Sequence, residues 1–175
     1  MSNEMLNLIR QRRSIRNYEA RQIPASDLDA ILEAGCYAPS AMNEQPWRFT
    51  VIQDSEVRSW FLQTCRRALH KDDDFDPFYG APTIVLVSAK KDAIAPQCDA
   101  SLAMENMFLA AASLGIGSCW IHCVNDVFAS PEWEALKQRL HIPADHISVG
   151  SCILGYSAEG LPAPKPRQEG VIVKF

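Results

Sequence analysis

The most informative segment for the architecture is QCDASLAMENMFLAAASL, residues 97–114. Its length and composition predict the longest helix of the chain, and its C-terminal half is apolar on nearly every face. A helix that is apolar all round must be covered all round. The chain has 175 residues, which fits one domain or one protomer of an interlocked oligomer. In so small a domain, the segment predicts either a central helix or a helix at a subunit interface.

Further helices are predicted on both sides of this segment. Ser26 suits an N-cap and Gly35 a helix end, which together predict a helix over 26–35. Ser130-Pro131-Glu132 predicts the start of a helix that runs to about Leu140. The remaining amphipathic patterns predict helices over 3–12 and 55–69.

Runs of apolar and β-branched residues predict the strands. Trp47, Phe49 and Val51 alternate with polar residues in WRFTVIQD, and three later apolar runs extend the set. The predicted strands are 47–54, 83–89, 118–124 and 146–156, with a last strand pattern, VIVKF, at 171–175 after a Pro-rich extended tail. Because strands and helices alternate after residue 47, these patterns alone favour a parallel doubly wound sheet.

The glycines do not support a Rossmann dinucleotide site. Gly115 and Gly117 give only GxG, and Trp120 stands where a third glycine would be needed. The fingerprint needs that glycine for close packing between the helix and the strand. A dinucleotide-binding domain of this type is therefore disfavoured.

Composition excludes several classes of partner. The net charge is −4, with 47% hydrophobic and 22% charged residues. An acidic chain lacks the basic face that nucleic acids and anionic membranes attract. No apolar run approaches the ~18 residues of a membrane span. The N-terminal MSNEMLNLIRQRRS has no apolar signal-peptide core, so we expect a cytoplasmic protein.

The six cysteines are expected to be buried free thiols, because most lie in apolar patterns and no secretory signal is present. A metal site at Cys119, His122 and Cys123 is the alternative. A structural zinc site needs a fourth ligand and usually a CxxC-type knuckle, and neither occurs here. We therefore expect no metal.

Two basic clusters occur at the ends of the chain, RQRRSIR at 10–16 and PKPR at 164–167. Ser14 stands among the arginines of the first cluster. Lys165 and Arg167 are two apart in a proline-stiffened segment, so their side chains point the same way. Such forked, charged donors suit a phosphate dianion. The alternative is that all of these are solvated surface charges.

Two loops have unusual compositions. APSAMNEQPW at 38–47 places Ser40, Asn43 and Gln45 before a proline–tryptophan step. HKDDDFDPFYGAP at 70–82 mixes acids with three aromatic residues. The second loop could be a mobile cover over a pocket or a surface connection that packs its aromatic side chains inward.

Together these pieces resemble the nitroreductase family of FMN-dependent oxidoreductases. The residues that carry the resemblance occur in the family's order and span essentially the whole chain. They are RRSIRNY at 12–18, APSAMNEQPWRF at 38–49, AMENMFLAAASLGIGSCWI at 103–121 and KPR at 165–167.

The resemblance implies an α+β, three-layer fold with a mixed, mainly antiparallel sheet flanked by helices. This replaces the parallel sheet that the patterns favour. It also implies an interlocked homodimer of single domains, residues 1–175, in which the helix at 97–114 buries its extra face against its twin. The C-terminal extension, about 160–175, would reach over the partner and add VIVKF to its sheet.

The resemblance also implies an FMN site at the dimer interface, with no catalytic side chain and no metal. Arg12, Lys165 and Arg167 would hold the FMN phosphate. Arg13 and Ser14 would contact phosphate or ribityl, and Arg16 would lie near the pyrimidine edge of the flavin.

Two further segments complete the implied site. The loop carrying Pro39, Ser40, Asn43 and Gln45 would reach into the flavin site of the other subunit. Residues Ile121, His122 and Cys123 would pass the flavin ring, with the backbone N–H near His122 bonding flavin N5.

Two features depart from the family. Family members often carry a small residue where His122 stands, so its imidazole could narrow the pocket, donate a proton or simply pack. The acids of DDDFDPF replace a segment that in some members offers a cationic or amide contact to the flavin. We expect these acids to face solvent.

The implied function is an FMN-dependent NAD(P)H oxidoreductase that reduces nitroaromatics, quinones or similar electron-poor acceptors by a ping-pong mechanism. A specialised flavin-dependent dehydrogenase or dehalogenase is one alternative, although it would need a lid or an added acid. A flavin-binding or redox-sensing protein with little turnover is another. A nucleotide-binding dimer without flavin is disfavoured, because neither GxGxxG nor a P-loop occurs.

Overall fold

The structure is a computed structural model and describes residues 3–175. Its elements are α1 (Glu4–Gln11), α2 (Ala25–Cys36), the 3₁₀ turn η1 (Ala41–Asn43), β1 (Trp47–Ile52), α3 (Ser55–Ala68), β2 (Thr83–Lys90), α4 (Pro96–Ser113), β3 (Gly117–Ile121), α5 (Val124–Phe128), α6 (Trp133–Arg139) and β4 (His146–Gly155).

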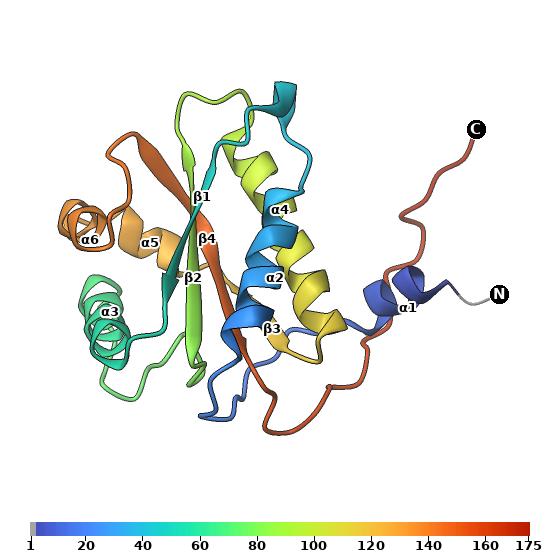
Figure 1. The fold of residues 1–175 in the computed structure, drawn as a ribbon, viewed down its shortest axis with the longest axis horizontal. Helices are drawn as coiled ribbons and strands as arrows, with labels where there is room; N and C mark the ends of the chain where they lie inside the picture. The colour runs from blue at the N-terminus through green and yellow to red at the C-terminus, as the bar shows by residue number, and fades with distance from the viewer. Residues whose placement is uncertain (1–2) are drawn as a thin grey trace.

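The sheet has the strand order β1-β2-β4-β3, and each neighbouring pair is antiparallel (Figure 1). The parallel sheet favoured by the patterns is therefore wrong. Helices cover both faces of the sheet, so its central strands are continuous apolar runs, which are also typical of parallel sheets. One parallel bridge, Ser14 to Ser118, adds the segment after α1 beside β3. The sheet is thus mixed and mainly antiparallel, as the family resemblance implies.

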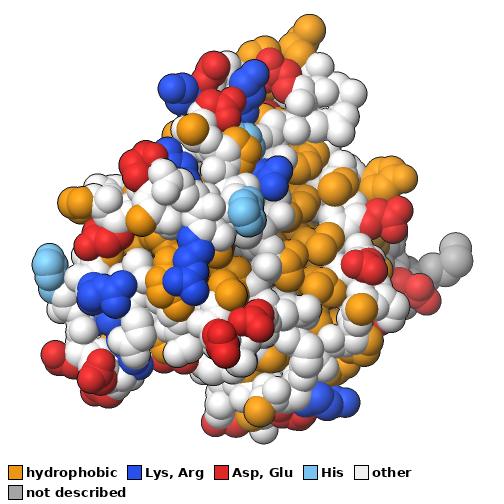
Figure 2. Space-filling view, turned by 60° about the vertical axis from the view of Figure 1, so that its left-hand side comes forward, with side chains coloured by type: hydrophobic (Ala, Val, Ile, Leu, Met, Phe, Trp, Pro, Cys, Tyr) orange, Lys and Arg blue, Asp and Glu red, His pale blue; other side chains and the backbone are white. Residues whose placement is uncertain are grey.

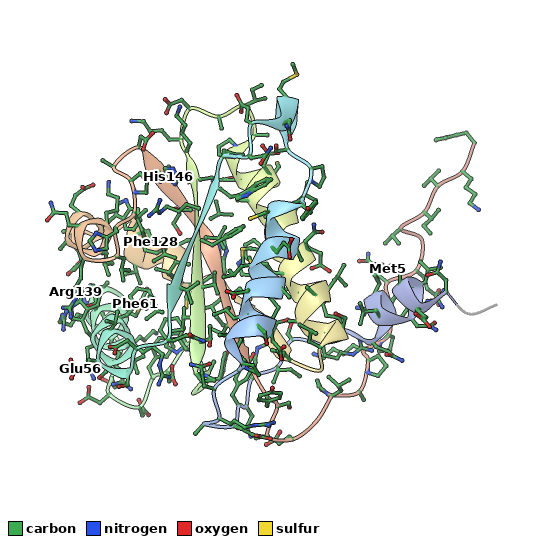
Figure 3. All side chains as sticks on the ribbon, in the orientation of Figure 1. Met5, Glu56, Phe61, Phe128, Arg139 and His146 are labelled. Atoms are coloured by element: carbon green, nitrogen blue, oxygen red, sulfur yellow. The ribbon has the colours of Figure 1, made fainter. Side chains whose placement is uncertain are left out.

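The molecule has three layers (Figure 1). Helices α2 and α4 pack on one face of the sheet through a cluster that includes Val85, Val87 and Met104. Helices α3, α5 and α6 cover the other face through Phe61, Leu136 and their neighbours. Figure 3 shows Phe61 and Phe128 between these helices and the sheet. The α+β, three-layer prediction is confirmed.

Helix α4 is covered on one side only within a single chain. Its buried stripe is Asp99, Ala100, Ala103, Met104, Met107, Phe108 and Ala111. On another face, Leu102 is 47% exposed, and Leu114, the C-cap residue after α4, is 41% exposed. The sequence pattern predicts a helix covered all round, and a single chain leaves Leu102 uncovered.

Helices α2 and α4 pack closely at Gly35. A Cβ there would lie 2.9 Å from Met107 Cγ and 3.1 Å from the Phe49 ring. Gly35 is therefore needed for this approach and lies inside α2, which continues to Cys36. The predicted ending of the helix at Gly35 is wrong. The predicted N-cap is also wrong, because Pro24 and not Ser26 precedes the first turn.

Three predicted elements differ near the C-terminal half. The strand predicted over 118–124 ends at Ile121, and α5 begins at Val124. The helix predicted from residue 131 begins at Trp133. Residues 171–175 form no strand in the described chain and are exposed. A strand needs a neighbour for its hydrogen bonds, and within the described chain residues 171–175 pair with no strand.

The burial of the cysteines was predicted only in part. All six are free thiols; Cys65, Cys119 and Cys152 are buried, whereas Cys36 and Cys98 are exposed. The prediction of buried thiols is wrong for those two, because each lies near one end of its helix. Among residues 3–175, no helix is long and apolar enough to cross a membrane. Figure 2 shows charges of both signs scattered around exposed hydrophobic side chains on one face.

Candidate functional site

The arginine segment is fixed to the edge of the sheet. Helix α1 ends at Gln11, and the chain then extends beside β3. The backbone N–H of Ile15 donates to Ser118 O at 3.0 Å. Ile15 is buried, so Ser14 and Arg16 face the other way on this extended segment. Ser14 and Arg16 therefore lie on the side of this segment opposite the core, beside edge strand β3.

Two of these arginines already have protein contacts. Arg12 Nε lies 3.6 Å from Glu105 Oε1, and the Arg12 guanidinium lies 5.9 Å from the Phe108 ring. Arg13 Nη1 donates to the carbonyls of Arg10 and Arg12, each at 2.7 Å. Arg13 Nε is buried and has no hydrogen-bond partner among the described residues. Arg12 and Arg13 line a cavity of about 270 Å³ between α1, the start of β3 and the C-terminal segment.

A cavity of about 610 Å³ opens beside the end of β3. Arg16 lines it together with Trp120, Ile121, His122 and Cys123. The β3–β4 ladder ends at the Ile121–Ser151 pair, so His122 and Cys123 lie beyond the strand in a turn into α5. The structure therefore brings Arg16 and residues 120–123 to one cavity.

Trp120 is held in place by its neighbours. A Cβ at Gly150 would lie 2.9 Å from Trp120 Cε2, so the indole packs directly on the β4 backbone. The Phe108 ring meets Trp120 edge-on, with 6.4 Å between centroids. This packing links α4, β3 and β4 at one wall of the cavity.

The 70–82 segment forms the opposite wall. Lys71, Asp72, Asp74, Phe75, Asp76, Pro77 and Tyr79 line the cavity. Phe78 is buried and stacks on Phe61 at 5.4 Å. The segment thus packs an aromatic side chain inward, as the second alternative predicts, and it also borders a cavity.

The acids of this segment differ in their roles. Asp72 and Asp74 are exposed, as expected. Asp76 is half-buried, and its carboxylate accepts from the backbone N–H groups of Phe78 and Gly80, both at 2.8 Å. The expectation that all of these acids face solvent is wrong for Asp76, because its carboxylate satisfies the backbone of a tight turn.

The thiols near the site are not activated nucleophiles. Burial raises the pKa of the Cys119 thiol, although Arg16, a hydrogen bond with Ser14, and Arg12 oppose this. Burial, with Asp126, also raises the pKa of Cys123. Both groups are therefore protonated near neutral pH, and covalent thiol chemistry is disfavoured. No group of three or more His, Cys, Asp or Glu within residues 3–175 is arranged to hold a metal ion.

The 38–47 loop lies away from the arginine segment in the same chain. Figure 1 shows η1 and α1 at separate ends of the α2–α4 layer. The loop has φ of 58° at Asn43 and 48° at Gln45, which are unusual for residues other than glycine. Pro39, Asn43 and Gln45 are exposed, and Ser40 is half-buried. One chain does not bring these predicted residues to the cavity.

Internal hydrogen bonds fix the shape of this loop. Ser40 Oγ accepts from the backbone N–H of Gln45 at 3.0 Å, and Gln45 Nε2 donates to Asn43 Oδ1 at 3.0 Å. The Asp99 carboxylate at the start of α4 accepts from the backbone N–H of Ala41 at 3.2 Å. The loop is therefore held in a defined shape that projects from the chain.

Lys165 and Arg167 lie in the extended C-terminal segment, and both are exposed. Figure 1 shows this segment running past α1 and away from the sheet. The structure of one chain does not bring Lys165 or Arg167 to Arg12, so the predicted phosphate set is divided.

Sequence reasoning missed two polar residues next to the cavity, Asn125 and Ser148. Asn125 Nδ2 donates to Val149 O at 3.0 Å and lies 3.4 Å from His122 Nδ1. Ser148 Oγ donates to Asn125 Oδ1 at 2.7 Å. The spacing of His122 and Asn125, three apart, was the only available signal, because Ser148 comes from a distant strand.

The fold and site define a class: an α+β, three-layer protein with a basic segment bound to an edge strand next to a cavity. The chain belongs to the nitroreductase family, whose model matches residues 9–156. A solved nitroreductase with bound FMN from Bacteroides fragilis is 40% identical, with a TM-score of 0.92, and the match covers 99% of this chain and 100% of that one.

Two sequence relatives extend this comparison. A protein of Archaeoglobus fulgidus whose name includes NADH dehydrogenase/NAD(P)H nitroreductase is 38% identical over 157 residues, 87% of this chain and 85% of that protein. The iodotyrosine deiodinase of Thermotoga neapolitana is 24% identical over 189 residues, 98% of this chain and 97% of that enzyme.

Proposed function

We propose that this chain binds FMN and works as an NAD(P)H-dependent oxidoreductase that reduces nitroaromatics, quinones or similar electron-poor acceptors. The observation that carries the proposal is the RRSIR segment bound along β3, with Arg16 and residues 120–123 on one cavity. Membership of the nitroreductase family, and the FMN in the similar Bacteroides fragilis structure, support the choice of cofactor.

The residues present suit a phosphate-bearing aromatic group. Arg13 Nε is a buried donor without a protein partner, which a ligand oxygen would satisfy. Trp120 and Ile121 provide apolar surface at the cavity, and Arg16 provides a fixed positive charge on the same wall. These are the features that a flat ring with a polar edge needs.

Each residue has a proposed role toward FMN. Arg12 would bind the phosphate, and Arg13 and Ser14 the phosphate or ribityl chain. Arg16 would lie at the pyrimidine edge. The backbone of Ile121, His122 and Cys123 would run along the ring, with the N–H near His122 bonding N5. When bound, FMN supplies the atom that accepts and donates hydride.

The chain's own contribution is binding, charge and exclusion of side reactions. The Arg16 guanidinium stabilises negative charge that develops at the cavity during reduction. The protonated thiols of Cys119 and Cys123 do not compete as nucleophiles. The nucleotide donor and the acceptor substrate would both react at this one cavity. The donor would therefore leave before the acceptor enters, which is a ping-pong order.

We further propose that the site is completed by a second copy of the chain. Pro39, Ser40, Asn43 and Gln45 would enter the partner's cavity on their preformed loop. The exposed leucines of α4 would be buried against the partner. Residues from about 160 to 175 would extend over it, which would bring Lys165 and Arg167 to a phosphate. We expect this homodimer in the cytoplasm.

An anaerobic visible spectrum of the purified protein, before and after addition of NADH and then NADPH, tests the function. Yellow protein that bleaches with either nucleotide and regains colour with menadione supports the proposal. Yellow protein that bleaches but is not reoxidised by any acceptor supports the alternative of a flavin-binding protein with little turnover. Colourless protein that does not take up added FMN contradicts the proposal.

A further inference from the structure

The side chain of His122 is exposed at the cavity, and one edge of its ring is already engaged. His122 Nδ1 lies 3.4 Å from Asn125 Nδ2. The backbone holds the two residues in one turn, because the Asn125 N–H donates to His122 O at 2.9 Å. The Nε2 side of the imidazole is the side left for the cavity.

The orientation of the Asn125 amide follows from its other two partners. A backbone carbonyl can only accept, so the atom 3.0 Å from Val149 O must be the NH₂ group. The amide oxygen then accepts from Ser148 Oγ at 2.7 Å. The Val149 carbonyl therefore fixes the flip of this amide, and the Ser148 hydroxyl, which can donate or accept, is compatible with it.

This orientation favours one tautomer of His122. One Asn125 amide hydrogen is used by Val149, and the other faces His122 Nδ1. Acceptance at Nδ1 is favoured, because an N–H at that position would oppose a second N–H. A neutral imidazole that accepts at Nδ1 carries its hydrogen on Nε2. The 3.4 Å contact is longer than the two hydrogen bonds that Asn125 makes with Val149 and Ser148. It therefore favours the Nε2–H tautomer without fixing it.

We propose that the Nε2–H of His122 is a hydrogen-bond donor to the acceptor substrate and that Asn125 is its positioning residue. The proposal rests on the proposed function and adds a selecting residue to it: among electron-poor acceptors, His122 favours those with a carbonyl or nitro oxygen conjugated to the ring. Hydride addition brings two electrons and one hydrogen to such a molecule. One negative charge then develops on its oxygen, until water supplies a proton. A fixed N–H at that oxygen stabilises the charge.

The other groups on the cavity do not offer the same contact. Arg16 and Lys71 carry full positive charges, whereas Asp72, Asp74 and Asp76 only accept when ionised. Asp76 is committed to the backbone of its own turn. The Tyr79 hydroxyl and the indole N–H of Trp120, whose ring packs on Gly150, are the other uncharged donors of this cavity. His122 differs from both because Asn125, in the same turn, orients its ring.

The tautomer is tested on FMN-loaded protein labelled with ¹⁵N-histidine. The chain has four histidines, and the spectrum of His122→Phe assigns the missing ring. Long-range ¹H–¹⁵N correlations at neutral pH should show pyridine-type Nδ1 and pyrrole-type Nε2 for His122. Asn125→Asp, which removes the amide donor, should invert this pattern or protonate both nitrogens. An Nδ1–H tautomer in the unmodified protein overturns the proposal.

Substrate selection is tested with two uncharged replacements of His122, one without an N–H donor and one with it. His122→Phe keeps a ring but has no N–H, whereas His122→Gln keeps an amide N–H near the position of Nε2. The probes are menadione, which has carbonyl oxygens, and methylene blue, which has none. We expect His122→Phe to lower the ratio of kcat/KM for menadione to that for methylene blue by about tenfold, the loss of one hydrogen bond. His122→Gln should restore most of that ratio.

Equal ratios in the two variants mean that His122 acts only by filling space, and they overturn the proposal. This failure is distinct from failure of the proposed function. In the first case the protein is yellow and bleaches with NAD(P)H, and only discrimination between the two acceptors is absent. In the second case the unmodified protein binds no FMN or is not reduced.

Discussion

The two ends of the proposed site are built differently. The segment 12–16 is joined to β3 by backbone hydrogen bonds and lies next to the cavity in a single chain. The loop 39–45 is equally well ordered by internal hydrogen bonds, yet it projects from another end of the molecule. A loop that keeps a fixed shape while its side chains stay exposed is suited to contact another chain. In our proposal, the first region is the part of the site that one chain assembles by itself, and the second is a part supplied to another chain.

Loss of Arg12 should produce the largest effect on the first region. Arg12→Ala removes a proposed phosphate ligand that makes charge-assisted hydrogen bonds, so we expect the dissociation constant of FMN to rise by about 100-fold or more. Folding should persist, because the exposed Arg12–Glu105 contact contributes little. The readout is FMN titration by fluorescence, with circular dichroism as the folding check.

Arg21→Ala is the matched control for that experiment. Arg21 carries the same charge but stacks on Tyr156 at 3.6 Å, outside the cavity. Its removal should leave FMN binding within about twofold, because it makes no proposed contact to the cofactor. If Arg12→Ala keeps its full FMN content, the phosphate assignment is wrong.

The C-terminal segment, residues 160–175, tests whether FMN binding depends on residues far from Arg12, and the expected effect is smaller. Arg167→Ala should raise the FMN dissociation constant by about 10-fold, the loss of one charge-assisted hydrogen bond. Lys174→Ala removes an equal charge further along the same exposed segment and should have little effect. Equal binding by both variants would mean that the tail takes no part in the site. Isothermal titration of FMN into the apoprotein measures both.

Gly35→Ala separates the scaffold from the site. An alanine in a helix normally stabilises it by about 1 kcal/mol relative to glycine. Here the added Cβ would press on Met107 and Phe49, and overpacking costs about 1–3 kcal/mol. We expect a net loss of about 1 kcal/mol in the free energy of unfolding, measured by urea denaturation, with unchanged FMN affinity. A gain in stability would show that the α2–α4 contact has room to spare.

The smallest expected effect concerns His146, which lies outside segment 12–16 and loop 39–45. We expect it to make the free energy of unfolding depend on pH. Burial lowers the pKa of His146, whose Nδ1 lies 3.0 Å from Ser88 Oγ; Arg48 and Lys90 also lower it, whereas Asp145 raises it. The unfolded chain then binds more protons below about pH 6.5. Stability should therefore fall as the pH drops through that range, and His146→Gln should reduce the slope. An unchanged slope in urea denaturation between pH 7 and pH 5 would contradict this.

The sequence predicted the elements better than their arrangement. Apolar periodicity identified α4 and the buried strands, because burial acts on side chains close in the sequence. The strand directions could not be predicted in this way, since residues such as Val85 and Val87 are apolar whether their neighbours run parallel or antiparallel. Gly35 was assigned to a helix end for the same reason: its role is set by Met107, far away in the chain.

The candidate site shows the same limit. The residue types of RRSIR suggested an anion site, but the resemblance to the family was needed to connect them with residues 120–123. The contact that joins them, Ser14 with Ser118, is a backbone bridge between distant segments. The orientation of His122 depends on Asn125 and, through it, on Ser148 of β4. No local pattern in the sequence encodes that network.

The direct test of a site shared between two chains is a mixed dimer. One chain carries Arg12→Ala. The other carries Ser40→Ala, Asn43→Gly and Gln45→Gly, which remove the loop side chains while glycine retains the positive φ at 43 and 45. The two chains are given different affinity tags, and FMN is measured per purified mixed dimer. If the loop serves the partner's site, one site has both defects and the other has none. The mixed dimer should then bind half as much FMN as the wild type, whereas each variant alone binds little. If the loop serves its own chain, both sites are defective. A mixed dimer without FMN, or a protein that remains monomeric, would contradict the shared site.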